Sequence, residues 1–236
     1  MKNYTNLDNV AHAGIKVNSR FSADYGDNLS QAQVFVTEFE SLQREYAVFF
    51  KKTDAGEYYA MTLLGLDSDE NLFLKDTEWD AKYIPAIIQR GPFQIGVPET
   101  GDPIIKIDLE SPRIDSEKGE PLFKPNGGLS PYLTHISKVL EQIHVGLEMN
   151  AKFFKELEDA SLIEAVTLDL KLDDSTNYSV PGVYSINEAA FQALSGSVLE
   201  KFHSSGLLAL CQYVLSSRKN IQHLLDRKIL KTHASG

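Results

Sequence analysis

Apolar residues recur with helical spacing between residues 131 and 159. The stripe consists of Leu133, Ile136, Leu140, Ile143, Leu147, Phe154 and Leu157. Asn150 takes the one polar position within it, and Ser130 followed by Pro131 is typical of a helix start. The spacing predicts one long helix over about 131–159. Its apolar face either packs on the domain's own core, the favoured interpretation, or pairs with a second copy as a coiled coil in which Asn150 sets the register.

Short strands are predicted in the first half of the chain. Residues 47–50 and 58–66 are rich in aromatic and large apolar side chains, and the intervening Asp54, Ala55 and Gly56 favour a hairpin turn. Further strands are predicted at 71–74 and 104–109, and a short helix is predicted at 83–91, started by Pro85.

The last third of the chain predicts two strands followed by helices. Residues 165–172 alternate apolar and polar positions, which indicates a half-buried strand, and a second short strand is expected at 182–186. Helices are expected at 187–194, 197–216 and 218–230. The fold class is therefore α+β: short, mostly antiparallel strands, one long helix, a β-hairpin-like pair and a C-terminal helical cluster. No linker divides the chain, so a single domain over 1–236 with a core at about 7–230 is expected.

Composition limits the classes of protein to which the chain can belong. The chain is 42% hydrophobic and 24% charged, which suits a globular core, and its formal net charge of -10 argues against binding nucleic acid. No apolar run is long enough to cross a bilayer, and the first ten residues lack a signal-peptide core, so a soluble cytoplasmic protein is expected.

The acidic excess is unevenly distributed. Residues 54–120 carry 15 acids against six bases, whereas 197–236 carry two acids against six bases. We expect the basic tail, with Arg227, Lys228 and Lys231, either to pack near the acidic region or to meet an acidic partner.

Most motifs of enzymes and metal sites are absent. The sequence lacks phosphate-binding glycine loops, the G-x-S-x-G motif and the H-E-x-x-H motif. Asp67, Asp69, Asn71 and Glu78 have the spacing of a calcium-binding EF-hand loop, but Leu72 stands where that loop needs glycine. No cofactor and no metal are therefore expected.

Aromatic residues gather around one arginine. Trp79, Tyr83 and Phe93 lie near Arg90 in the sequence, an arrangement that can recognise a carboxylate or a peptide. The favoured alternative is that the rings fill the core while Arg90 pairs with an acid.

Two polar residues, Glu120 and His203, are weaker candidates for a catalytic role. Glu120, between Gly119 and Pro121, is either a catalytic acid or a solvated loop residue, the second being favoured. His203 is a lone histidine on a predicted helix, which is more often structural than catalytic.

The order of short motifs resembles that of SapC-family bacterial proteins over about 7–226. The motifs are EYAVFF at 45–50, LLG at 63–65, ENLFL at 70–74, WDAKYIPA at 79–86, RGPF at 90–93, GEPLF at 119–123, GVYSINE at 182–188 and HSSG at 203–206, with Leu194, Tyr213, Ser217 and Asn220. The chain departs from the usual pattern at Ala47, where the family has proline, and at Gly91, where it has an aromatic residue.

The resemblance implies a role in bacterial surface-protein or outer-membrane-uptake gene neighbourhoods, without assigning a reaction. The favoured hypothesis is a non-catalytic accessory protein that binds a peptide or protein partner. The residues expected to take part are Asn71, Trp79, Tyr83, Arg90, Phe93, Glu120 and His203. The long helix 131–159 is expected to contribute to partner binding or to the pairing of two copies.

The alternative hypothesis is an enzyme of unknown reaction that uses a polar cluster containing Arg90, Glu120 and His203.

Overall fold

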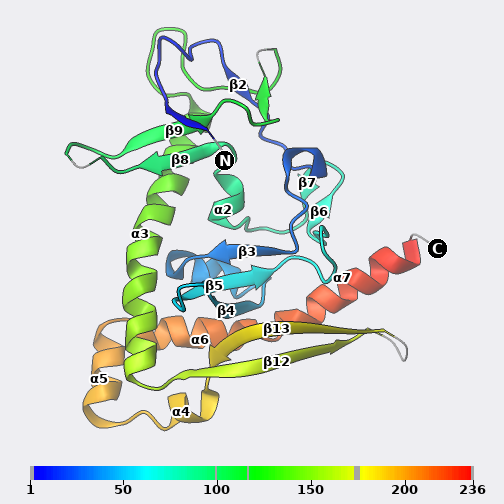
Figure 1. Ribbon diagram of the computed structural model, residues 1–236, viewed down its shortest axis with the longest axis vertical. Coiled ribbons are helices and arrows are strands. Elements are labelled where there is room, and N and C mark those ends of the chain that lie inside the picture. Colours follow the sequence, from blue (N-terminus) through cyan, green and yellow to red (C-terminus); the bar gives the residue numbers. More distant parts are fainter. Residues whose placement is uncertain (1–2, 99, 116, 173–175, 235–236) are drawn as a thin grey trace. The chain divides into compact units, whose positions relative to one another are not determined.

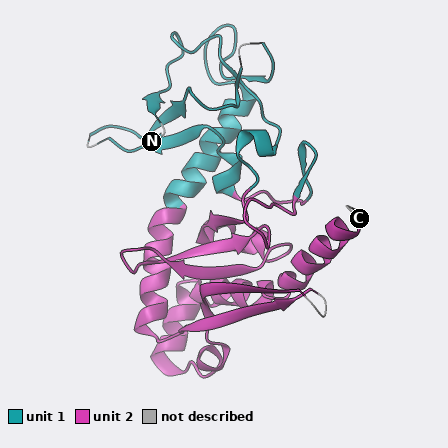
Figure 2. Cartoon of the chain, turned by 45° about the vertical axis from the view of Figure 1, so that its right-hand side comes forward, with its two compact units in different colours: residues 1–28, 74–80, 86–145 teal, residues 29–73, 81–85, 146–236 magenta. Residues whose placement is uncertain are grey.

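The computed structural model describes residues 3–98, 100–115, 117–172 and 176–234. Helices and antiparallel strands are mixed along the chain, which confirms the α+β class (Figure 1). The chain forms two compact units that interleave in sequence (Figure 2). Unit 1 comprises 1–28, 74–80 and 86–145, and unit 2 comprises 29–73, 81–85 and 146–236. The long helix α3 (Pro131–Asp159) has the predicted bounds and contributes to both units.

Unit 1 is built from short antiparallel strands. Its first sheet has the order β1-β9-β8, with β1 (Tyr4–Asn6), β9 (Ile104–Asp108) and β8 (Phe93–Gly96). Its second sheet has the order β10-β2-β11, with β10 (Ile114–Asp115), β2 (Lys16–Val17) and β11 (Glu120–Pro121). The ribbon β6 (Leu74–Lys75) with β7 (Glu78–Trp79), the 3-10 turn η1 (Ala23–Tyr25) and the short helix α2 (Ala86–Gln89) complete the unit.

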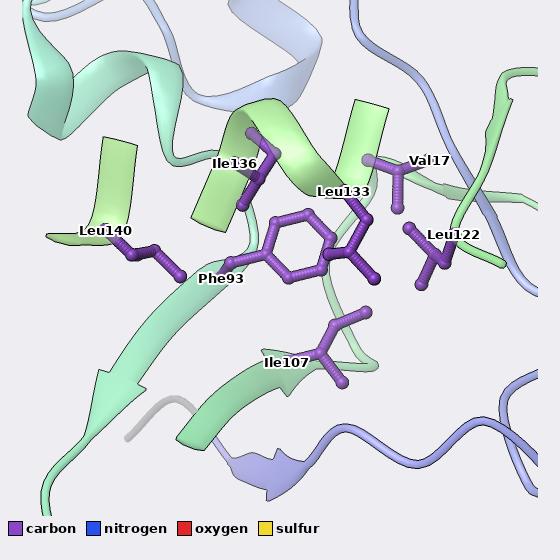
Figure 3. Close-up of a cluster of buried hydrophobic side chains, with 7 residues drawn as sticks. All are labelled: Val17, Phe93, Ile107, Leu122, Leu133, Ile136 and Leu140. Atoms are coloured by element: carbon purple, nitrogen blue, oxygen red, sulfur yellow. The ribbon is translucent and has the colours of Figure 1, made fainter. Parts of the chain in front are cut away.

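The core of unit 1 forms around Phe93, which is fully buried. The first half of α3 brings Leu133, Ile136 and Leu140 to this ring, and Ile107 faces it from the paired strand (Figure 3). These helix positions belong to the predicted apolar stripe. The expectation that the stripe packs on the chain's own core is therefore confirmed here.

A buried ion pair also holds unit 1 together. Nη2 of Arg113 lies 2.6 and 2.5 Å from the two carboxylate oxygens of Asp27. Nη1 of the same arginine donates to the carbonyl oxygens of Asn18 and Arg20. Both side chains of the pair are less than a tenth exposed. Arg113 thus fixes the loop from Asn18 to Asp27 against the strand that begins after it.

Unit 2 contains a five-stranded antiparallel sheet with the order β12-β13-β4-β5-β3. Its strands are β3 (Gln31–Val34), β4 (Val48–Lys52), β5 (Tyr58–Leu63), β12 (Ile163–Lys171) and β13 (Asn177–Ile186). Its helical segments are η2 (Val36–Glu38), α1 (Phe39–Leu42), α4 (Glu188–Gln192), α5 (Gly196–Ser204), α6 (Leu207–Ser217), α7 (Asn220–Ala234) and the second half of α3. None of the described helices combines the length and the apolar character that a bilayer crossing needs.

The predicted hairpin at 47–66 is present as β4 and β5. Phe50 pairs with Ala60, and the N–H of Thr53 donates to the carbonyl of Glu57 at 2.8 Å across the turn. Gly56 has a φ of +86°, a left-handed conformation that suits glycine in a tight hairpin loop. The local signals in this segment are thus sufficient to place the turn.

The second half of α3 approaches the sheet closely at one glycine. A Cβ added at Gly146 would lie 2.6 Å from Cβ of Phe35, which leaves no room for a larger residue. Because successive helix residues point about 100° apart, Leu147 turns away from this contact. The expectation that Leu147 joins the buried stripe is wrong, since its exposed fraction is 49%.

The side chain of Asn150 forms hydrogen bonds with the backbone at the edge of the chain's own sheet. Its Oδ1 accepts the N–H of Val36 at 2.8 Å, and its Nδ2 donates to the carbonyl of Val34 at 3.4 Å. Backbone groups at the end of edge strand β3 are thereby satisfied by a side chain. The polar member of the stripe therefore fastens α3 to β3 within one chain.

Several predicted elements differ from the structure. The strand expected at 182–186 begins earlier, as β13 over Asn177–Ile186, and the helix expected at 83–91 is only Ala86–Gln89, α2. The strand expected at 71–74 is a turn that only joins β6 at Leu74, because Oδ1 of Asn71 accepts the N–H of Phe73 at 3.0 Å. The helix expected at 197–216 is two helices, α5 and α6, separated at Gly206, whose φ of +78° ends the first.

The basic C-terminal helix packs against acidic residues of unit 2. Nζ of Lys228 bonds Asp67 and lies 2.8 Å from Glu70, and Nζ of Lys231 lies 3.2 Å from Glu70. Burial alone would raise the pKa of Glu70, but hydrogen bonds from Lys228, the Leu66 N–H and Lys231 lower it overall. The expected packing of the basic tail on the acidic region is confirmed.

Candidate functional site

The aromatic candidates in unit 1 are buried. Trp79 on β7 is 8% exposed and meets the ring of Phe21 edge to face at 5.6 Å. Phe93 lies at the centre of the unit 1 core (Figure 3). The centroid of its ring is 6.2 Å from that of Tyr132. Burial raises the pKa of Tyr132 to about 12; the Arg113 charge opposes this shift and the Glu120 charge adds to it. As expected from the favoured alternative, these rings fill the core.

The polar candidates of unit 1 differ in exposure. Nη1 of Arg90 donates to the carbonyl of Phe93 at 3.0 Å, and its Nε is buried with no hydrogen-bond partner among the described residues. Arg90 thus holds the backbone between α2 and β8, rather than pairing with an acid among the described residues. Glu120 is exposed on β11, where it stands opposite Val17.

The remaining candidates belong to unit 2. Asn71 is 3% exposed and forms the turn described above. The hydroxyl of Tyr83 donates to Glu38 at 3.3 Å, and its carbonyl accepts the hydroxyl of Tyr46 at 2.5 Å. His203 is exposed on α5. Tyr83 therefore ties segment 81–85 to the rest of the unit.

Several motif residues near the C-terminus also have structural contacts. Oγ of Ser217 accepts the N–H of Val48 at 3.0 Å, at the start of β4. Nδ2 of Asn220 donates to the carbonyls of Gln43 and Tyr46 at 2.8 and 2.9 Å. These side chains pair with backbone groups of distant segments. The two motif residues therefore help to hold unit 2 together.

The seven candidates are divided between the two units. Trp79, Arg90, Phe93 and Glu120 lie in unit 1, and Asn71, Tyr83 and His203 lie in unit 2. Arg90 and Phe93 share a described contact. As a binding or catalytic set, the seven residues stay a prediction.

A groove in unit 2 is the stronger candidate. Residues of the second half of α3, the β4–β5 turn and β3 line it, and its cavity volume is about 490 Å³. We name it the hairpin groove. Its lining residues are Gln33, Thr53, Ala55, Gly56, Glu57, Tyr58, Tyr59, Leu147, Asn150, Ala151, Phe154, Lys155 and Glu158. This volume falls within the range of about 300–1,000 Å³ that is usual for ligand sites.

The apolar part of the hairpin groove is anchored in the core. The ring of Phe154 is 4% exposed, and Tyr58 stacks on it at 6.0 Å with an interplanar angle of 24°. Phe50 meets Phe154 edge to face at 5.0 Å. Half-exposed Leu147 continues this apolar surface along α3. The rings are held in place on several sides, so the surface is preorganised.

The rim of the hairpin groove is charged. Nζ of Lys155 lies 2.9 and 3.2 Å from the carboxylate oxygens of Asp159, and this hydrogen bond raises the pKa of Lys155. Glu57 and Glu158 are exposed on the two sides. Nζ of Lys52 lies 4.5 Å from the centroid of the Tyr58 ring, whose hydroxyl raises the pKa of Lys52 by hydrogen bonding.

No pattern in the sequence predicted this groove. The hairpin and the helix were each predicted, but their meeting depends on Asn150 and Gly146, which lie more than 100 residues after their contacts in β3 and the following turn. One signal was available: Leu147 and Gly146 occupy adjacent positions, and a glycine beside an apolar residue in a helix marks a close approach on one face.

The described residues contain no group of three or more histidine, cysteine, aspartate or glutamate side chains placed to hold a metal ion. Two residues of the EF-hand-like spacing instead have protein partners. Asp67 bonds Lys228, and Oδ1 of Asn71 bonds a backbone N–H.

Comparison with known proteins identifies the family. The SapC family profile matches residues 7–224, which is most of the chain. No curated protein and no solved structure gives a significant match. The order of motifs over the matched region and the profile agree, and the chain belongs to the SapC family.

Proposed function

We propose that this chain is a non-catalytic accessory protein that binds a segment of a partner protein in the hairpin groove. The observation that carries the proposal is the combination of a fixed aromatic floor, Phe154 and Tyr58, with half-exposed Leu147 beside it. Protein-binding surfaces commonly place apolar and aromatic anchors inside a polar rim. Glu57 and Glu158 supply such a rim.

The family context supports this proposal without identifying the partner. The resemblance implies work beside surface proteins or outer-membrane uptake systems, where an accessory protein has protein clients. Action in the cytoplasm is part of the same proposal. The motif residues favour structure over chemistry, since Ser217, Asn220 and Tyr83 all satisfy internal hydrogen bonds.

The enzyme alternative has less support. The described hydrogen bond of Arg90 goes to a backbone carbonyl, and Glu120 and His203 are exposed. A general acid or base is usually held by neighbours that set its pKa and orientation. The described contacts of these three residues do not include such an arrangement, so they do not favour catalysis.

Self-association through 131–159 also stays a proposal. Leu133, Ile136 and Leu140 of the stripe are buried within the chain. A second copy would therefore use exposed residues of α3 such as Leu147 and Met149. This proposal is tested by comparing the molar masses of wild type and a Leu147→Gln variant, measured by light scattering at two concentrations.

Site-specific photo-crosslinking tests the partner-binding function. A photoreactive residue at position 147 should capture a discrete partner in the native host, and the same residue at position 149 should not. Leu147 and Met149 are 49% and 39% exposed on the same helix but point in different directions, so they form a matched pair.

Binding measurements with the purified protein and partner then give the contribution of Leu147 to the affinity. Burying the exposed part of Leu147 at about 25 cal/mol per Å² is worth about 1–2 kcal/mol, so Leu147→Gln should weaken binding about five- to thirtyfold. Met149→Gln should leave the affinity unchanged. Equal capture from both positions, or a partner whose affinity ignores Leu147→Gln, refutes the proposal.

A further inference from the structure

The charges around the hairpin groove are biased toward acid. Glu57 and Glu158 line it without a described ion pair, whereas the single lining cation, Lys155, is paired with Asp159. The carboxylate of Asp159 offsets the charge of Lys155 locally. The charge of Lys52, outside the lining, also acts on Glu158. Three carboxylates, those of Glu57, Glu158 and Asp159, then stand against two lysines, so the field at the rim stays biased toward acid.

One ring of the groove lining, that of Tyr58, already carries an ammonium group of the chain itself on its face. Nζ of Lys52 lies over the face of Tyr58 at 4.5 Å and over the face of Tyr184 at 5.5 Å. Such contacts arise because the face of an aromatic ring carries negative charge density. Tyr59, partly exposed in the same lining, adds a second ring of the same chemistry.

Taken together, the floor and the rim require different properties of one ligand. Leu147 and Phe154 favour an apolar side chain, while Glu57 and Glu158 of the same lining favour a cation. An acidic segment would bring like charges together at the rim, which opposes binding. A basic side chain next to an apolar one satisfies both parts.

We infer that the hairpin groove binds a basic, apolar-containing peptide segment, in which lysine or arginine faces Glu57 and Glu158 and a neighbouring apolar side chain packs on Leu147 and Phe154. This inference rests on the proposed function and specifies the chemistry of the partner. A groove that binds through its apolar floor alone would show no preference for basic segments.

A random library of 12-residue peptides displayed on phage tests the inference. The library is selected in parallel on wild type and on Leu147→Gln, and peptides recovered only from wild type are synthesised. Their affinities are measured by fluorescence anisotropy for wild type and for the double variant Glu57→Gln/Glu158→Gln. The control is Asp169→Asn/Glu200→Gln, which removes the same charge from exposed residues of unit 2 outside the groove.

We expect the Leu147-dependent peptides to be enriched in lysine and arginine relative to the unselected library. Exposed ion pairs contribute about 0.2–1 kcal/mol each, so the loss of two should make the groove double variant bind these peptides about two- to thirtyfold more weakly. The control should bind as wild type does. Raising NaCl from 0.1 to 0.5 M should weaken wild-type binding more than binding by the groove variant.

The outcomes separate the two proposals. Leu147-dependent peptides without basic enrichment, or with affinities that ignore the glutamate substitutions, overturn the basic-segment inference and leave partner binding in the groove standing. Failure to recover any Leu147-dependent peptide overturns both.

Discussion

Substituting Gly146 by alanine sets two effects of opposite sign against each other. In a helix interior, alanine is more stable than glycine by about 1 kcal/mol, so the local effect is stabilising. The added Cβ would lie 2.6 and 2.9 Å from Cβ and Cγ of Phe35, and 3.0 Å from Oγ1 of Thr37. Phe35 is 1% exposed, and its Cβ is fixed by the backbone, so it cannot swing aside.

Overpacking of this kind costs about 1–3 kcal/mol and more when backbone must move. The contact at 2.6 Å belongs at the upper end of that range. Subtracting the helix preference leaves a net destabilisation of about 1–2 kcal/mol for Gly146→Ala. The variant should also change the hairpin groove, because α3 must move away from Phe35 and Leu147 moves with it.

Urea unfolding of wild type and Gly146→Ala, followed by circular dichroism, measures the change. Ala151→Gly on the exposed face of the same helix is the control, and it should destabilise by about 0.5–1 kcal/mol through helix preference alone. Stabilisation of Gly146→Ala by the amount that the control loses would refute the close approach of α3 to Phe35.

Three further substitutions test the contacts that hold the units. Asn150→Ala removes the acceptor of the buried Val36 N–H and should cost about 1–3 kcal/mol in urea unfolding, whereas an unchanged midpoint would contradict this hydrogen bond. Glu70→Gln should lower stability at pH 7 and narrow its deficit toward pH 3, because the lowered pKa of Glu70 stabilises the fold above the unfolded-state value and this is lost as the pH falls. Parallel pH profiles for the variant and wild type would disprove that role of the Lys228–Glu70 pair. Arg113→Met leaves Asp27 charged and buried and should cost about 3–5 kcal/mol, with partial recovery when Asp27→Asn is added; a double variant no better than the single one would count against the pair.

Local patterns in the chain were enough to predict its long helix and its first hairpin. The 3-4 spacing after Ser130 and Pro131 predicted α3 with its bounds, and the turn residues at 54–56 predicted the β4–β5 hairpin. These signals lie within a few residues of the structure that they specify. Elements that depend on distant partners were missed, among them the two-residue strands β2, β10 and β11, which exist only through pairing across about 100 residues.

The candidate site shows the same division. The residues with chemical character, such as Trp79, Arg90 and Phe93, were easy to single out, but whether a ring fills a core or lines a surface depends on what packs on it. Phe93 proved to be the centre of the unit 1 core. The hairpin groove has no motif of its own, because its walls come from separate segments.

By itself, the sequence determined the fold class, the long helix, the hairpin and the resemblance to the SapC family, since each rests on spacing or on short motifs. Only the tertiary structure decided that Asn150 binds the edge of β3, that Leu147 is exposed, and that Lys228 is paired with Glu70. The physical reason is that helix and turn preferences act between near neighbours in the chain. Burial, the pairing of Lys228 with Glu70 and the walls of the groove depend on contacts between residues that lie far apart in the chain.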